Sequence, residues 1–85
     1  QVQVNTTVPG LAPEEIERLV TFPVEISMRG MAGVEQIRSI TRFGLSQVTV
    51  VFNDEVDIYR ARQMVAERLA GALRELPSNA EAKLG

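Results

Sequence analysis

The amino-acid sequence predicts an α+β fold class, the ferredoxin-like split βαβ sandwich, in which an antiparallel four-stranded sheet carries two helices on one face. Stretches of period-two alternation near residues 1–8, 34–52 and 80–84 indicate strands. The two stretches between them repeat apolar residues at helical spacing. The resulting order is βαββαβ, and right-handed crossovers on one sheet bring both helices to the same side.

The first strand is expected at residues 1–8, where Val2 and Val4 begin an alternation of apolar and polar side chains. Pro9 and Gly10 end it, because proline cannot donate to a sheet ladder and glycine frees the backbone to turn. A helix is expected from Pro13, since proline at the first helical position gives up an N–H that has no partner there.

An apolar stripe identifies this first helix, and it comprises Ile16, Leu19, Val20, Pro23, Val24 and Ser27. Pro23 lies inside the stripe, so we expect one missing backbone hydrogen bond and a bend near residues 19–22. Phe22 is expected on the outer side of the helix. Gly30 and Gly33 close the element.

A β-hairpin is expected in the middle of the chain. Its first strand runs from Val34 to Phe43, a short turn covers residues 44–46, and the second strand ends at Phe52. Strands joined by so short a turn pair in antiparallel fashion. The side chains expected to share one face of the first strand are Ile37, Ser39, Thr41 and Phe43.

The second helix is the longer one, and Asp57 is its predicted N-cap. Its apolar stripe comprises Ile58, Ala61, Val65, Leu69, Ala72, Leu73 and Leu76. Pro77 breaks the helix, and residues 80–84 alternate as a short last strand.

Composition excludes several classes of function. The chain has 85 residues, which hold one domain at most, and it lacks both cysteine and histidine. It therefore has no disulfide, thiolate nucleophile, Cys/His zinc site or Ser-His pair, and we predict neither an enzyme nor a bound cofactor. A net charge of −2 and 5% aromatic residues argue against nucleic-acid binding, which needs a positive field and stacking side chains. No apolar run approaches the about 20 residues of a membrane span.

Two groups of residues could suggest a metal site. Asp54, Glu55 and Asp57 share one loop, but their spacing is not that of an EF-hand, and turn and cap chemistry explains them. Thioethers bind Cu(I), yet methionines near a helix end more often pack than ligate. We therefore expect a packing role for the methionines of this chain, which are Met28, Met31 and Met64.

The outer face of the second helix is the candidate interaction site. At about 100° per residue, the residues opposite the apolar stripe are Arg60, Gln63, Glu67, Gly71 and Arg74. Glycine on a solvent face costs about 1 kcal/mol relative to alanine. A second helix that approaches closely would explain Gly71, and so would simple tolerance near a helix end; both explanations stay open.

Several runs of the sequence are distinctive: Val8–Glu17, Leu19–Glu25, Ile37–Val50, Asp57–Arg62 and Glu67–Leu69. These runs resemble one family, the heavy-metal branch of the resistance-nodulation-division efflux pumps, which includes cobalt-zinc-cadmium and copper-silver exporters. The resemblance covers essentially the whole chain. Ala32 departs from the proline that usually precedes the corresponding glycine.

The resemblance implies that residues 1–85 form the first periplasmic porter subdomain of a much longer bacterial inner-membrane protein. That protein would be a homotrimeric, proton-driven antiporter of metal cations that works with a periplasmic adaptor and an outer-membrane channel. The second helix would face the threefold axis and line the pore, where Arg60, Gln63, Glu67, Gly71 and Arg74 would meet the neighbouring copies. The family's substrate-binding and proton-relay residues lie elsewhere, so none is carried over.

Two alternatives are left open by the residues themselves. The chain could be a standalone ferredoxin-like interaction or regulatory module that pairs through its helices or a sheet edge. It could also be a periplasmic carrier that binds Cu(I) or Ag(I) through its methionines.

Overall fold

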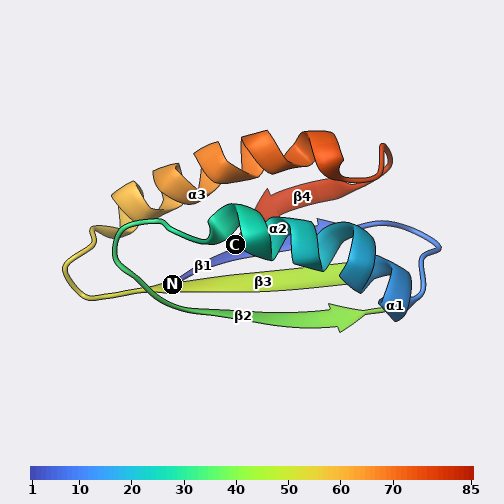
Figure 1. Ribbon diagram of the computed structural model, residues 1–85, viewed down its shortest axis with the longest axis horizontal. Helices are drawn as coiled ribbons and strands as arrows, with labels where there is room; N and C mark the ends of the chain where they lie inside the picture. Colours follow the sequence, from blue (N-terminus) through green and yellow to red (C-terminus); the bar gives the residue numbers. More distant parts are fainter.

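The computed structural model describes residues 1–85 and shows the expected order of elements (Figure 1). The elements are β1 (Val2–Thr7), α1 (Pro13–Ile16), η1 (Glu17–Thr21), α2 (Phe22–Met28), β2 (Val34–Arg42), β3 (Leu45–Phe52), α3 (Ile58–Ala72), η2 (Leu73–Glu75) and β4 (Glu81–Leu84). Because α1, η1 and α2 follow one another without a break, they form a single helical segment. No helix is both long and apolar enough to cross a bilayer.

The four strands form one sheet in the order β2-β3-β1-β4, with antiparallel pairing throughout. Val4, for example, lies opposite Val48 on one side and Leu84 on the other. Gly85 extends the β4 pairing, because its N–H donates to the Gln3 carbonyl at 2.8 Å. Both ends of the chain therefore lie together at one end of the sheet (Figure 1). The predicted fold class is confirmed.

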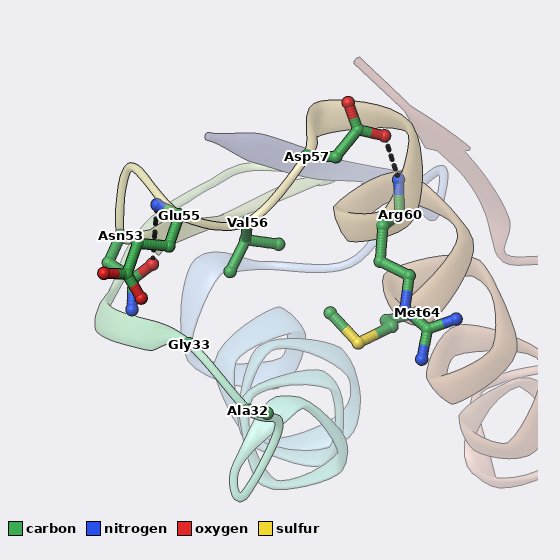
Figure 2. Close-up of a pocket in the computed structure, with 8 residues that line it drawn as sticks. All are labelled: Ala32, Gly33, Asn53, Glu55, Val56, Asp57, Arg60 and Met64. Atoms are coloured by element: carbon green, nitrogen blue, oxygen red, sulfur yellow. Dashed lines mark hydrogen bonds between the residues drawn. The ribbon is translucent and has the colours of Figure 1, made fainter.

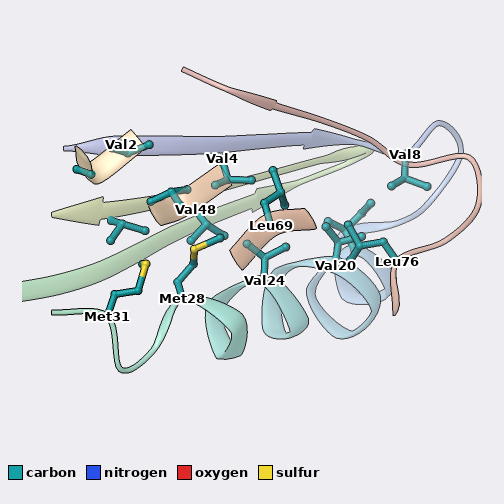
Figure 3. Close-up of a cluster of buried hydrophobic side chains, with 14 residues drawn as sticks. Val2, Val4, Val8, Val20, Val24, Met28, Met31, Val48, Leu69 and Leu76 are labelled. Carbon is teal, nitrogen blue, oxygen red and sulfur yellow. The ribbon is translucent and has the colours of Figure 1, made fainter. Parts of the chain in front are cut away.

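A single core of 14 buried residues lies between the sheet and the helices (Figure 3). The valines of β1 and β3 form its floor, and the expected alternation holds, since Val2, Val4, Val48 and Val50 are all fully buried. The helical residues that cover this floor are Ile16, Val20, Val24, Met28, Ala61, Val65 and Leu69. Apolar burial at about 25 cal/mol per Å² is the main favourable term that holds so small a domain together.

A π-helical turn precedes Pro23 in the first helical segment, and the bend expected there stays a prediction. A proline ring inside an α-helix clashes with the carbonyl four residues earlier. Here residues Glu17–Thr21 form a π-helical turn, and the Phe22 N–H donates to the Glu17 carbonyl, five residues back. The wider turn accommodates the proline at the place where the sequence predicts an irregularity. It also brings Thr21, which is not in the predicted apolar stripe, into the interior.

The hairpin turn was predicted at residues 44–46, but in the structure it starts one residue earlier and ends two residues earlier. β2 ends at Arg42 and β3 begins at Leu45, so the loop consists of Phe43 and Gly44 alone. Gly44 has a φ of 71° while Phe43 has no positive φ, the pattern of a type II turn, whose third residue needs a positive φ that glycine adopts without strain. Phe43 is 69% exposed in this loop and does not lie on the inner face of the strand.

Two residues of the apolar stripe predicted for the second helix are also exposed. Ile58 and Leu73 have exposed fractions of 45% and 46%. Ile58 is the first residue of α3, and Leu73 is the first of the 3₁₀ turn η2. At about 100° per residue Leu73 lies at the outer edge of the arc formed by the buried Ala61, Val65 and Leu69, and Leu76, after η2, is buried again.

Candidate functional site

The outer face of α3 carries the residues that the sequence singled out. The core contacts of Ala61, Val65 and Leu69 fix the orientation of the helix. Asp57 caps its first turn as predicted, since a carboxylate oxygen accepts from the Arg60 N–H at 3.2 Å. All of the candidate residues are exposed, with Arg60, Gln63, Glu67 and Gly71 on α3 and Arg74 in η2. The structure brings them together on one surface, and their contact with another copy stays a prediction.

The charges on this face have no partners within the chain. The only salt bridge in the structure joins Arg18 and Glu15 at 3.0 Å, on the first helical segment. Arg60, Glu67 and Arg74 are therefore free to pair with groups outside the chain. Exposed ion pairs contribute little to the folding stability of a monomer. These charges are therefore more relevant to binding another molecule than to the stability of the fold.

Gly71 is not explained by anything inside this chain. Its φ is not positive, and a Cβ built at this position would meet no heavy atom within 4 Å. An alanine would fit without strain, so neither local geometry nor packing calls for glycine. The choice between close approach of another helix and simple tolerance therefore depends on what lies outside the chain.

Two arginines on α3 anchor the helix to its neighbours, and sequence reasoning missed both. Arg68 Nη1 donates to the Ser27 and Arg29 carbonyls at 3.2 and 3.0 Å, where α2 ends. Arg62 Nη1 donates to the Gly85 carbonyl at 3.3 Å. Cations are favourable beside the free carbonyls of a helix C-terminus, which is the one signal that could have suggested Arg68.

A cavity of about 550 Å³ lies beside the start of α3 (Figure 2). The residues that line it come from the loop before β2, the β3–α3 connection and α3 itself: Ala32, Gly33, Asn53, Glu55, Val56, Asp57, Arg60 and Met64. Val56 and Met64 point toward one another into the hollow (Figure 2). Asn53 holds the loop in shape, because its side-chain oxygen accepts from the Glu55 N–H at 3.0 Å. Because three separate segments form this cavity, no local sequence pattern predicts it.

A second hollow, of about 540 Å³, lies on the sheet face that no helix covers. Its side chains are mainly polar, and Gln47 Nε2 donates to Gln3 Oε1 at 3.3 Å across the strands. Arg38 similarly donates to the side-chain oxygen of Gln1 at 3.3 Å. This face is hydrophilic, as expected for the uncovered side of an antiparallel sheet.

The methionines lie where packing residues belong. Met28 and Met31 are part of the core (Figure 3), with exposed fractions of 0% and 7%. Met64 lines the cavity and packs against the core. No group of three or more His, Cys, Asp or Glu side chains is arranged to hold a metal ion. Of the acidic residues in this loop, Asp57 caps α3, and the backbone N–H of Glu55 donates to the Asn53 side chain.

The sequence matches known proteins over its full length. It is 51% identical over 85 residues to the cation efflux system protein CzcA of Alcaligenes sp. strain CT14, covering 100% of this chain and 8% of that protein. It is 39% identical over 85 residues to the cation efflux system protein CusA of Escherichia coli strain K12, again over 8% of the relative. A crystal structure of a heavy metal efflux pump superposes with a TM-score of 0.91 at 43% identity, over 99% of this chain and 9% of that one.

These relatives confirm the resemblance to heavy-metal efflux proteins. The chain spans about 8% of the length of the curated relatives that it matches. The model of the AcrB/AcrD/AcrF family matches residues 1–84, which is nearly every residue. The chain belongs to the AcrB/AcrD/AcrF family.

Proposed function

We propose that this chain is a periplasmic porter subdomain of a proton-driven pump that exports heavy-metal cations across the bacterial inner membrane. The observation that carries the proposal is the superposition of 99% of the chain on one segment of a heavy metal efflux pump, at a TM-score of 0.91. The names of the relatives, which are cation efflux and metal resistance proteins, support the same role. The metal cation is then the transported substrate.

The role of the subdomain is contact and movement, and it catalyses no reaction. Its single core and continuous sheet suit a body that moves as a unit. Because the two ends of the chain are hydrogen-bonded neighbours at one end of the sheet, connections to the rest of the pump would enter and leave side by side. Such an attachment lets the whole subdomain pivot about that end during alternating access.

The surfaces of the chain suit the partners expected of such a pump. The polar, uncovered face of the sheet is available to other subdomains of the same polypeptide. The outer face of α3 is available to the same helix of two neighbouring copies in a homotrimer. The periplasmic adaptor and the outer-membrane channel complete the assembly, and no nucleic acid takes part.

The size and location of the native polypeptide test this proposal. We expect an antibody against the chain to detect, in the membrane fraction of the source cells, a polypeptide many times heavier than 9.4 kDa. Disruption of its gene is expected to lower tolerance of at least one of cobalt, nickel, zinc, cadmium, copper or silver. A soluble product near 9.4 kDa would contradict the proposal and favour a standalone interaction or regulatory module.

A further inference from the structure

The helix α3 presents two unlike flanks on either side of its outer face. At about 100° per residue, one flank, called here the tyrosine flank, carries Tyr59, Ala66, Ala70 and Leu73. The opposite flank, called here the cavity flank, carries Arg60, Met64 and Gly71. Gln63, Glu67 and Arg74 lie between them.

Tyr59 is the most exposed large hydrophobic side chain of the protein, with an exposed fraction of 78%. Nothing in the chain covers its ring, although Ala61, only two residues further along, is buried. A tyrosine ring supplies a large apolar area at a low cost in side-chain entropy, and its hydroxyl needs a polar partner. Tyr59 is therefore suited to insert into a hollow with apolar walls and a polar end.

The cavity beside α3 has these properties. Val56 and Met64 supply apolar walls that face each other (Figure 2). A thioether beside an aromatic ring and a guanidinium over its face are both favourable contacts, which Met64 and Arg60 would supply. Glu55 and Asp57 also line the cavity, and a carboxylate can accept from a phenol hydroxyl. A volume of about 550 Å³ leaves room for the ring.

Tyr59 cannot serve the cavity of its own chain, because it leaves α3 on the other flank. The tyrosine and the cavity nevertheless lie at the same level, at the start of the helix. An interface that joins two different patches is heterologous, and under cyclic symmetry it closes into a ring. With three parallel α3 helices around an axis, each Tyr59 faces the cavity of the next copy.

The charges of the two flanks are complementary. Glu55, Asp57 and Arg60 line the cavity, so it carries a net charge of −1, and neither carboxylate forms a salt bridge within the chain. Arg62, one turn from Tyr59, has no carboxylate partner and contacts only the Gly85 carbonyl among side-chain hydrogen bonds. Docking of the tyrosine flank would thus bring the Arg62 guanidinium toward carboxylates that have no salt bridge. Such complementarity favours one register over others.

We propose that Tyr59 of each copy inserts into the cavity of the neighbouring copy, between Val56 and Met64, and so joins the α3 helices into a closed ring. The contact rests on the proposed function, which supplies the neighbouring copies. Gln63, Glu67 and Arg74 then point toward the axis, and Ala66, Ala70 and Gly71 let the helices approach closely.

Disulfide cross-linking in the full-length pump tests this contact. In a background without other cysteines, we expect the double variant Tyr59→Cys, Met64→Cys to give covalent trimers on a non-reducing gel after mild oxidation with diamide. A bond within one copy is excluded, because residues five apart on a helix have Cα atoms about 8–9 Å apart, beyond the about 7 Å that a disulfide spans. Tyr59→Cys paired with Glu55→Cys provides a second test, in case the Met64 variant fails to fold.

The controls separate failure of this contact from failure of the proposed assembly. Each single-cysteine variant is expected to stay monomeric on the gel. The pair Tyr59→Cys, Phe43→Cys is expected not to cross-link, because the exposed Phe43 lies at the other end of β3 from the cavity.

Covalent dimers of Tyr59→Cys alone would contradict the contact, because residues 59 of two copies would then meet each other. Monomers from both double variants of a pump that native mass spectrometry shows to be trimeric would overturn it and leave the trimer standing. A parent pump that is not trimeric would overturn both.

Discussion

Buried threonines on facing elements of the core differ in the hydrogen bonds that their hydroxyls make. Thr21 Oγ1 lies 2.9 Å from Thr41 Oγ1 and 2.8 Å from Ser46 Oγ, so the π turn is tied to β2 and β3. Thr6 is equally buried, at 1% exposure, but its hydroxyl has no partner. Thr6 and Ser46 lie opposite each other in the sheet, so the two environments are close together.

Substitution of each threonine by valine is expected to change stability in opposite directions. Thr21→Val removes a partner of the buried Ser46 hydroxyl and should lower the free energy of unfolding by about 1–3 kcal/mol. Thr6→Val removes an unpartnered hydroxyl and should raise it by about 1 kcal/mol. Urea unfolding of the 85-residue chain measures both, and equal losses for the two variants would contradict the difference.

Gly71 is the residue at which the isolated chain and the proposed pump should differ. Gly71→Trp is expected to lower trimer yield and metal tolerance, because a bulky side chain would separate helices that pack closely at the axis. Gly71→Ala is the control: open space surrounds the position, so it should stabilise the 85-residue chain by about 1 kcal/mol. Unchanged trimer yield and metal tolerance in Gly71→Trp would contradict the placement of this face at a helix contact.

At the scale of single elements, α3 depends on a cap that the sequence predicts correctly. Asp57 has an extended backbone with ψ of 137°, and its side chain accepts from the third residue of the helical start. Because no acidic residue occupies the first turn, this carboxylate is also the nearest negative charge to the positive end of the helix.

We expect loss of this cap to destabilise the first turn of α3. Asp57→Ala should lower the free energy of unfolding by about 1 kcal/mol, and Asp57→Asn should retain most of it, since the amide oxygen can still accept. Hydrogen exchange of the Arg60 amide, which donates to Asp57, should accelerate in the alanine variant. Protection of that amide at the parental level would argue against the capping bond.

In the first helical segment, the proline rule predicts where the helix becomes irregular but not what form the irregularity takes. Proline in a helix predicts an irregularity near Leu19, and the chain does depart from the α-helix at Glu17–Thr21. The form of the irregularity depends on the hydrogen-bond partners that the neighbouring strands provide. Here the Thr41 and Ser46 hydroxyls on β2 and β3 hold Thr21 in the wider turn.

At the scale of the whole molecule, the single core predicts that the chain unfolds in one step. Of the 14 core residues, 11 come from β1, β3 and both helical segments, and Val8, Met31 and Leu76 lie in the connections, so no helix or strand has a core of its own. We expect the helical signal in far-ultraviolet circular dichroism and the valine methyl signals in NMR to be lost at the same urea concentration. Loss of helical signal before the methyl signals of β1 and β3 would show that the helices detach separately.

The sequence by itself determined the order of strands and helices, the buried faces of β1 and β3, and the cap at Asp57. It also carried the family resemblance, because the matching runs are contiguous stretches of residues. All of these depend on residues that are near one another along the chain. Alternation places Val2 and Val4 on one face whatever the rest of the molecule does.

The tertiary structure alone decided the features that arise where distant segments meet. The cavity needs the loop at Gly33, the connection at Val56 and the helix at Met64 together. The hydroxyl network joins Thr21 to β2 and β3 residues at least 20 positions away. Such features depend on distances through space, and no period along the sequence encodes those distances.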